Sequence, residues 1–302
     1  MATVDLHRAT AGKSRDLYYV ETGDFDPATY ISVYLIDGER PAVVDTGTGA
    51  NADVLVDALA QLDLSPAELE AIVLTHVHLD HAGGAGYLAE AAPNADVYVH
   101  EAGAKHLVDP ARLWAGTKAA VGDQIQFYAD PRPIEESRIV PLEAGDRIDL
   151  GDRELVAHPA PGHAFHQFAF EDQSTGGVFT GDAAGILTPG LERIQPTSPP
   201  PDFDLESCLA DLESIDDLDP SALYLAHFGD HEPAGFLSRV ADVLESWVES
   251  IAETRAELGD EQTVEQFAER ADTVEAWGPV KARAEARMNV RGAIEYLDGT
   301  GE

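Results

Sequence analysis

Three histidines and one aspartate stand within six residues of one another, directly after a short apolar strand. The segment His76-Val-His-Leu-Asp-His81 follows the buried-strand run 71–74 and precedes the glycine-rich stretch 82–86. Side chains two apart on a strand point to opposite faces, so His76 and His78 can converge only where the chain has left the sheet. We expect the glycines to permit a turn there. Imidazoles and a carboxylate so arranged suit Zn²⁺, Fe²⁺ or Mn²⁺, and the sequence therefore predicts a metal site.

Strands and helices alternate over about the first 230 residues, which predicts an α/β protein with mixed sheets. The runs expected to form strands are 16–22, 30–36, 41–45, 71–74, 96–99, 153–158, 167–170, 177–180 and 222–225. Helical spacing is found at 53–62 and 205–215, and a capping box at Ser65–Glu68 predicts a short helix. Cys208, on the apolar face of the 205–215 helix, is expected to belong to the core.

The chain from residue 236 onward has a different pattern. Segments 236–258 and 264–296 are almost wholly helical, with apolar residues recurring every three or four positions. We therefore predict a main domain over 1–235 and a C-terminal helical extension over 236–302 that packs on it. Two stretches, 108–135 and 188–204, are expected to be irregular, and long loops of this kind either carry function or link elements.

The charge balance excludes several classes of partner. The chain has 19 Lys plus Arg and 56 Asp plus Glu, a formal charge of −37, which disfavours nucleic acid and anionic membranes. One cysteine excludes disulfides and thiolate clusters, and no apolar run approaches the ~20 residues that span a bilayer. The start of the chain has no basic segment followed by an apolar one, so we expect a cytoplasmic protein. Scattered acidic residues with only four Lys are typical of adaptation to molar internal salt.

The pattern His-x-His-x-Asp-His resembles the signature of the metallo-β-lactamase fold superfamily. Four further motifs of that family occur in order, ending at Gly47, His163, Asp182 and Gly229: Asp-Thr-Gly, Pro-Gly-His, Phe-Thr-Gly-Asp and Ala-His-Phe-Gly. The resemblance covers about residues 15–235. It implies a four-layer αβ/βα sandwich with two mixed β-sheets and with the metals at one edge.

The resemblance also implies roles for individual residues. One metal ion would be held by His76, His78 and His163, a second by Asp80, His81 and His227, and Asp182 would bridge the two. Two cations so placed would depress the pKa of a shared water and provide a hydroxide nucleophile. Zn²⁺ is the expected metal, with iron or manganese as alternatives. Asp182 and Asp80 are the expected catalytic carboxylates, and Asp80 would also accept a proton.

Further residues near these motifs are candidates for supporting the metal ligands or for contacting substrate. They are Asp45, His158, His166, Arg193 and His231, and Arg112 and Arg132 join Arg193 as candidate cations for an anionic carrier. Asp45 is expected to orient the metal loop rather than to bind metal. A structural role at a turn is an equally good interpretation of that residue.

Fold alone does not select a reaction in this superfamily. The leading hypothesis is a glyoxalase-II-like hydrolase of a small-molecule ester, thioester or lactone, since all seven metal positions are filled. A mononuclear iron persulfide dioxygenase is the alternative, because it would need only His76, His163 and Asp182. A metal-binding module without catalysis is a second alternative. Asp182 replaces the cysteine of the zinc β-lactamases, which disfavours antibiotic hydrolysis, and an apolar face on the tail helices would allow a homodimer.

Overall fold

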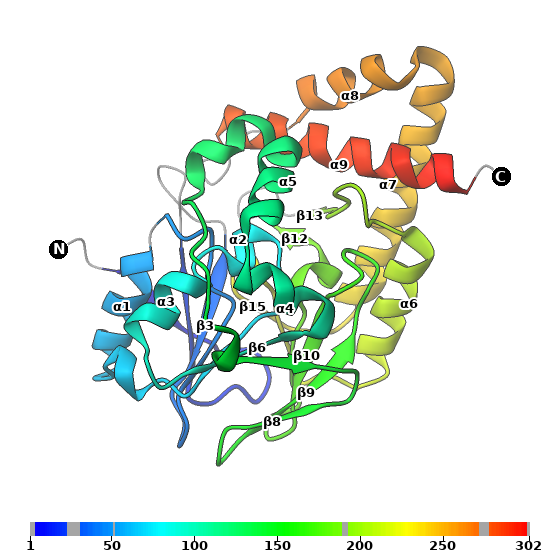
Figure 1. Ribbon diagram of the computed structural model, residues 1–302. Coiled ribbons are helices and arrows are strands. Elements are labelled where there is room, and N and C mark those ends of the chain that lie inside the picture. Colours follow the sequence, from blue (N-terminus) through cyan, green and yellow to red (C-terminus); the bar gives the residue numbers. More distant parts are fainter. Residues whose placement is uncertain (1–3, 23–30, 51, 189–192, 272–277, 301–302) are drawn as a thin grey trace.

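The computed structural model describes residues 4–22, 31–50, 52–188, 193–271 and 278–300, and it shows two mixed β-sheets with helices on their outer faces (Figure 1). The first sheet has the strand order β1-β2-β3-β4-β5-β6-β7, antiparallel from β1 to β4 and parallel from β4 to β7. Its strands are β1 (Leu6–Arg8), β2 (Leu17–Glu21), β3 (Ser32–Ile36), β4 (Ala42–Val44), β5 (Ala71–Val73), β6 (Asp96–His100) and β7 (Ile139–Leu142).

The second sheet has the order β15-β14-β11-β10-β9-β8, in which only β11 and β14 pair in parallel. Its strands are β8 (Arg147–Asp149), β9 (Glu154–Pro159), β10 (Phe168–Asp172), β11 (Gly177–Phe179), β14 (Ala222–Tyr224) and β15 (Asp230–His231). A separate small ribbon joins β12 (Ile186–Leu187) to β13 (Ile194–Gln195). The predicted mixed sheets are confirmed.

Helices cover both sheets. They are α1 (Ala52–Gln61), α2 (Leu79–Ala82), α3 (Ala85–Ala91), α4 (Glu101–Val108), α5 (Ala111–Val121), α6 (Leu205–Asp216), α7 (Phe236–Leu258), α8 (Asp260–Glu269) and α9 (Pro279–Gly299). Short 3₁₀ turns lie at η1 (Pro66–Glu68), η2 (Gly122–Phe127), η3 (Glu136–Arg138) and η4 (Gly181–Ala184). In the described part of the chain, no helix is both long and apolar enough to cross a membrane.

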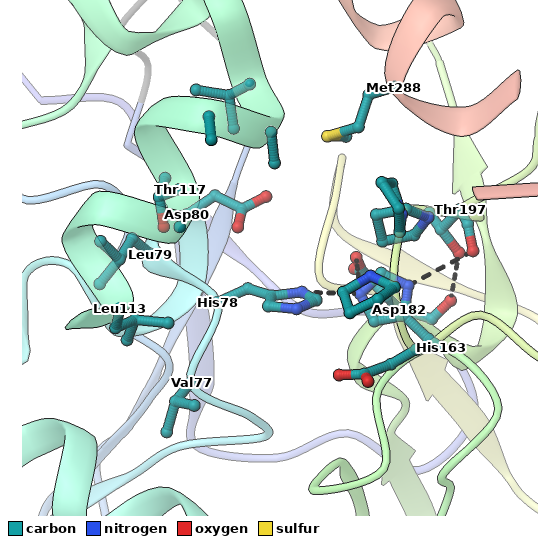
Figure 2. A pocket seen from close by; sticks show the side chains of 18 of the residues that line it. Val77, His78, Leu79, Asp80, Leu113, Thr117, His163, Asp182, Thr197 and Met288 are labelled. Atoms are coloured by element: carbon teal, nitrogen blue, oxygen red, sulfur yellow. Dashed lines mark hydrogen bonds and ion pairs between the residues drawn. The ribbon is translucent and has the colours of Figure 1, made fainter. Parts of the chain in front are cut away.

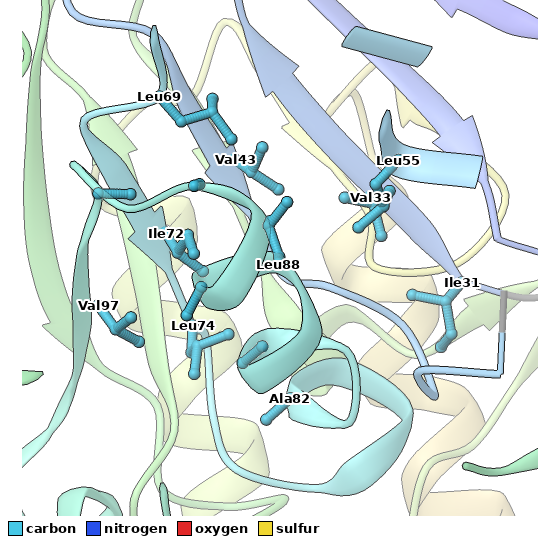
Figure 3. Close-up of a cluster of buried hydrophobic side chains, with 14 of the residues drawn as sticks. Ile31, Val33, Val43, Leu55, Leu69, Ile72, Leu74, Ala82, Leu88 and Val97 are labelled. Atoms are coloured by element: carbon cyan, nitrogen blue, oxygen red, sulfur yellow. The ribbon is translucent and has the colours of Figure 1, made fainter. Parts of the chain in front are cut away.

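Three apolar cores hold the layers together. Between the sheets, aromatic rings of Tyr34, Phe179 and Tyr224 contact one another at centroid distances of 4.7–5.6 Å. A second core joins the first sheet to its helices, as Leu55 and Leu88 face the strands in Figure 3. The third joins the second sheet to α6 and α7 and contains the buried Cys208, as expected. The result is the four-layer α/β sandwich with a C-terminal helical extension that the sequence predicts.

The prediction that 108–135 is irregular is wrong, because α5 occupies 111–121 and η2 follows it. Within α5 only Val121 is buried, so the helix has no continuous apolar stripe facing a core, and the periodicity test fails. Its alanine-rich composition and the Asp109-Pro110 start were the available signals; Asp109 Oδ1 accepts a hydrogen bond from the Ala111 amide at 3.2 Å.

The C-terminal helices also differ in detail from the expectation. Segment 264–296, predicted to be almost wholly helical, is divided between two helices: α8 begins earlier, at Asp260, and ends at Glu269, and α9 starts with Pro279, a residue suited to the first helical turn. The intervening residues 272–277 lie outside the described part. Helix α7 begins at Phe236, the first residue of the predicted extension, and α9 packs against α5 and η2 (Figure 1).

Candidate metal centre

The residues of the five sequence motifs all follow the carboxyl ends of strands. Asp45 follows β4, His76 to His81 follow β5, His163 follows β9, Asp182 follows β11 and His227 follows β14. Strands β4 and β5 are parallel, as are β11 and β14, so the segments that follow each pair leave the same edge of their sheet. The two edges meet, and the side chains converge there.

Three groups of potential ligand atoms form at this edge. They are His76, His78 and His163; His76, His81 and Asp182; and Asp80, His81 and His227, with the atoms of each group within 4.8 Å of one another. The first and third groups are the two sets that the family resemblance implied. His76, His81 and His227 are completely buried, and Asp182 is 5% exposed.

The Asp182 carboxylate lies between the two sets. Its Oδ1 is 3.0 Å from His227 Nε2 and 3.4 Å from His81 Nε2, and its Oδ2 is 3.3 Å from His163 Nε2. Figure 2 shows the His78 ring pointing toward His163, whose Nε2 lies 3.0 Å from His78 Nδ1. This position between both sets is the one that a bridging carboxylate needs.

The nitrogen atoms of the site fit a metal ion. In the described part of the chain, Nε2 of His76 and Nε2 of His81 are buried without a hydrogen-bond partner, although both lie in the densest cluster of imidazoles. Burying unpaired polar atoms is costly, and a cation bound by these neighbouring nitrogens would offset that cost. Imidazole and carboxylate donors without thiolate suit Zn²⁺, iron or manganese.

Electrostatics gives the residues suitable protonation states. Burial and repulsion from neighbouring imidazoles hold the pKa of His76 and of His78 well below the usual range, so both rings are neutral. Burial would raise the pKa of Asp182, but the surrounding histidines lower it well below its usual range, so it is a carboxylate. His81 is the exception: burial opposes charge on its ring, but Asp182 and Asp80 raise its pKa well above the usual value, so the metal-free ring is protonated and a metal ion would displace its proton.

Asp45 holds the metal loop, residues 76–81, in place through hydrogen bonds to His81 and to Thr75. Its Oδ2 lies 3.0 Å from His81 Nδ1, and its Oδ1 accepts a hydrogen bond from the Thr75 amide at 2.9 Å. A carboxylate on one ring nitrogen directs the other, His81 Nε2, toward the site. Asp45 has φ +61°, an uncommon conformation for a residue other than glycine, so the local fold holds it in place.

The glycines after the motif act by close packing rather than by turning. Gly83 and Gly84 have φ −61° and −81°, which any residue adopts. A Cβ on Gly84 would lie 2.2 Å from the Thr46 carbonyl oxygen, and one on Gly83 would lie 2.6 Å from that of Thr48. The absence of side chains therefore lets the metal loop lie directly against the segment after β4.

Thr197 and Ser198 hold His163 in place, the first by direct contact and the second by tying the segment to α9; neither was among the candidate site residues predicted from the sequence. The Thr197 carbonyl oxygen lies 3.3 Å from His163 Nδ1, and Thr197 Oγ1 donates to the Asp182 carbonyl oxygen at 2.8 Å. The next residue, Ser198, donates its amide to Asn289 Oδ1 at 2.7 Å, and this contact ties the segment to α9. Both lie in the stretch 188–204, for which the sequence left a functional loop and a linker open, so the sequence indicated the segment and the fold identifies the residues.

A cavity of about 690 Å³ opens above the metal site, between α5 and α9. His78, Asp80, His163 and Asp182 line its floor, and Figure 2 shows Leu113 and Thr117 on one side and Met288 on the other. His166, one of the predicted candidates, also lines it; burial lowers the pKa of its imidazole to about 4, so the ring is neutral.

The other candidates have different surroundings. His158 Nε2 pairs with Glu171 at 2.9 Å on the second sheet, and the His231 ring packs on Phe236, so neither lines the cavity. Both histidines lie near a motif in sequence, but the strands β9 and β15 direct them elsewhere. Arg193 lines a separate cavity of about 250 Å³.

Of the three candidate cations, only Arg112 lines the larger cavity, where Lys105 and Arg291 lie as well. Arg132 instead pairs with Glu90, and its guanidinium lies 3.9 Å from the centre of the Tyr87 ring. Lys105 and Arg112 are exposed, and with burial they lower the pKa of His106 between them.

Residues 26–227 match the sequence profile of the Metallo-beta-lactamase superfamily. A relative from the archaeon Sulfurisphaera tokodaii, the metallo-beta-lactamase fold-containing protein ST1585, is 26% identical over 71% of this chain and 79% of its own. Acyl-coenzyme A thioesterase MBLAC2 of Gallus gallus is 29% identical over 55% of this chain and 62% of its own. Hydroxyacylglutathione hydrolase of Aeromonas salmonicida is 30% identical over 65% of this chain and 60% of its own. The chain thus spans less than two thirds of the last two relatives.

Solved structures give the same fold. The ST1585 structure superposes with a TM-score of 0.70 at 24% identity, over 93% of this chain and 99% of that one. The metallo-beta-lactamase family protein TTHA1429 of Thermus thermophilus also has a TM-score of 0.70, at 22% identity, over 95% of this chain and 94% of its own. Both likenesses extend beyond the profile match, so they include the C-terminal helices.

Proposed function

Because the chain belongs to the metallo-beta-lactamase superfamily, we propose that it is a hydrolase of a small-molecule ester or thioester that uses two divalent metal ions, preferably Zn²⁺. The observation that carries this proposal is the pair of ligand groups joined by Asp182 at the floor of the cavity. When bound, the two ions would lower the pKa of a shared water and polarise the substrate carbonyl. A mononuclear site would leave His78, Asp80, His81 and His227 without a role.

The chain's own residues would divide the remaining work. Asp182 would position both ligand groups, since it lies within 3.4 Å of histidines from each. Asp80 lines the cavity and retains 18% side-chain exposure, so its carboxylate would accept a proton from water and release it to solvent. Asp45 would hold His81 in the orientation that directs Nε2 into the site.

A thioester is the bond type that the relatives favour. Two of them are named acyl-coenzyme A thioesterase and hydroxyacylglutathione hydrolase, and both names describe cleavage of an acyl group from a thiol carrier. The cations Lys105 and Arg112 at the cavity would attract an anionic carrier. The formal charge of −37 supports a small molecule rather than nucleic acid as the partner. A cytoplasmic, high-salt setting and a homodimer stay predictions.

The test combines metal content with hydrolysis. Protein purified in high salt without added metal is analysed by mass spectrometry and assayed with S-lactoylglutathione, a short acyl-coenzyme A and a simple lactone. We expect about two zinc ions per chain and hydrolysis that is lost in Asp182→Ala. Asp53→Ala, a change at an exposed position of α1, is the control and should leave both unchanged.

Other outcomes would contradict the proposal. About one iron per chain, with oxygen uptake on a persulfide and no hydrolysis, would identify a dioxygenase instead. Metal-loaded protein that cleaves none of the substrates and consumes no oxygen would favour a metal-binding module.

A further inference from the structure

We propose that the cavity-facing side of α5 is the binding wall for a long aliphatic acyl group, and that Gly116 sets the length that fits. This inference rests on the proposed function, because it assigns the acyl part of the same substrate. It concerns a region in which the sequence predicts an irregular loop.

Beyond Arg112 in its first turn, the cavity-facing side of α5 is a helical stripe without charged residues. Leu113, Gly116, Thr117 and Ala120 all line the cavity, and their spacing of three, four and seven residues places them on one face. None of the four is buried. A helix normally packs such a face against another element, so an open face of this kind is a surface for an apolar ligand.

The opposite side of the cavity offers apolar contact at Met288 and Phe165, beside the polar or charged α9 residues Glu285, Asn289, Arg291 and Glu295. Met288 of α9 faces the stripe in Figure 2, and a thioether side chain adapts readily to aliphatic groups of different shape. Phe165 also lines the cavity, and 53% of this side chain is exposed although it is large and apolar. An elongated apolar group would therefore contact Met288 and Phe165 as well as the α5 stripe.

Gly116 has no packing reason to be glycine. A Cβ built there would meet nothing within 4 Å, and its φ is not positive. At Gly86, by contrast, a Cβ would lie 2.2 Å from the Arg132 carbonyl oxygen. Glycine inside a helix destabilises it by roughly 0.5–1 kcal/mol relative to alanine, so folding alone would favour another residue at Gly116. Open space in the middle of the stripe is what the glycine provides.

The size and polarity of the cavity select the ligand class. A volume of about 690 Å³ is in the range that holds an entire drug-sized molecule. The described lining residues of α5 between Leu113 and Val121 carry no charge, so a polar acyl group would lose hydrogen bonds to water there. An aliphatic chain loses none, and each methylene buried should strengthen binding roughly fourfold.

The experiment uses uncleavable ligands, so that binding is measured independently of hydrolysis. Calorimetry on the metal-loaded full chain follows a series of S-alkyl thioethers of N-acetylcysteamine, from ethyl to dodecyl. The corresponding S-acyl thioesters are assayed in parallel. The test variant is Gly116→Leu, and the matched control is Ala115→Leu, the same side chain one position away on an exposed part of α5 outside the cavity. Leucine favours helix at both positions, and circular dichroism checks folding.

We expect affinity in the unmodified protein to rise roughly fourfold per methylene until the cavity is filled. Gly116→Leu should weaken dodecyl binding at least about tenfold, with a much smaller effect on ethyl, while Ala115→Leu should match the unmodified protein. Equal affinities along the series, or the same rise in Gly116→Leu, would overturn the inference. If the thioethers bind as expected but no thioester is cleaved, the proposed reaction fails and the binding wall stands.

Discussion

The floor and the wall of the cavity are built on opposite principles. Beneath the floor, His76, His81 and His227 are completely buried, and the Asp45 carboxylate and the Thr197 carbonyl oxygen are the acceptors that orient His81 and His163. On the wall, Leu113 packs partly against the core of the first sheet, whereas Gly116, Thr117 and Ala120 are small and partly exposed along the cavity. The side chains of the metal centre are therefore each fixed by several contacts. On the α5 wall, by contrast, a single substitution changes the shape of the cavity.

This difference separates reaction from selectivity. Metal binding needs buried donor atoms that several contacts hold in position. Most substitutions in the metal centre should therefore abolish activity. Acyl recognition needs only apolar area of the right length, so changes on the wall should alter which substrate is used. Four measurements test how strict that separation is.

Metal removal should have the largest effect. Without cations, the histidine and aspartate side chains of the metal centre would lose the ions that bind them to one another. A chelator should abolish hydrolysis and lower the melting temperature, and Zn²⁺ should restore both. A metal present at about a thousand times its Kd stabilises the folded state by about 4 kcal/mol when it binds only that state. Differential scanning calorimetry with and without chelator measures this. An unchanged melting temperature, with metal loss verified, would contradict the metal-dependent floor.

Asp45→Asn tests the floor one contact away from the metal. The amide can no longer provide a charged acceptor for His81 Nδ1 and both Thr75 donors. We expect metal affinity and kcat/KM to fall about 10- to 100-fold. Competition with a fluorescent zinc chelator gives the affinity, and Asp53→Asn on α1 is the control. Unchanged affinity in a folded variant would show that Asp45 serves the turn alone.

Asn289→Ala tests whether the separation holds, since this residue belongs to α9, across the cavity from the α5 wall, but acts on the metal centre through Ser198 and Thr197. Its side chain accepts from the Ser198 amide, and the adjacent Thr197 contacts His163. We expect metal affinity to fall by up to about tenfold through a misplaced imidazole. The absorption spectrum of the cobalt-substituted protein should also shift, which a purely structural role would not cause. Arg283→Ala, at an exposed position of α9, should leave the spectrum unchanged.

Removing the positive charges of Lys105 and Arg112 at the cavity should have the smallest effect on activity. The double variant Lys105→Ala, Arg112→Ala should raise KM for an acyl-coenzyme A about threefold to tenfold at low salt. The same acyl group on uncharged N-acetylcysteamine should be unaffected, and about 1 M salt should remove the difference. Lys13→Ala, Lys118→Ala changes the net charge equally away from the cavity lining and is the control. Equal KM changes for both carriers would contradict carrier recognition by charge.

The limits of sequence-based prediction follow the same division. The inner strands of both sheets and the histidine and aspartate motifs were predictable because buried runs and metal motifs are local patterns. The edge strands β1, β7, β8 and β15 and the β12–β13 ribbon were not predicted. Helix α5 was not, because its open face lacks the apolar stripe that identifies a helix packed on a core. His158 and His231 were placed near the site by their closeness to motifs, but strand direction carries both away.

By itself, the sequence determined the family, the two-sheet architecture and the histidine and aspartate side chains that the fold brings together. Only the tertiary structure decided that Asn289 and Thr197 support His163, that Arg112 but not Arg132 or Arg193 lines the larger cavity, and that Gly116 faces open space. The physical reason is the range of the interactions. Strand burial and ligand spacing are written within a few residues, whereas a cavity exists only where segments more than a hundred residues apart, such as α5 and α9, come together.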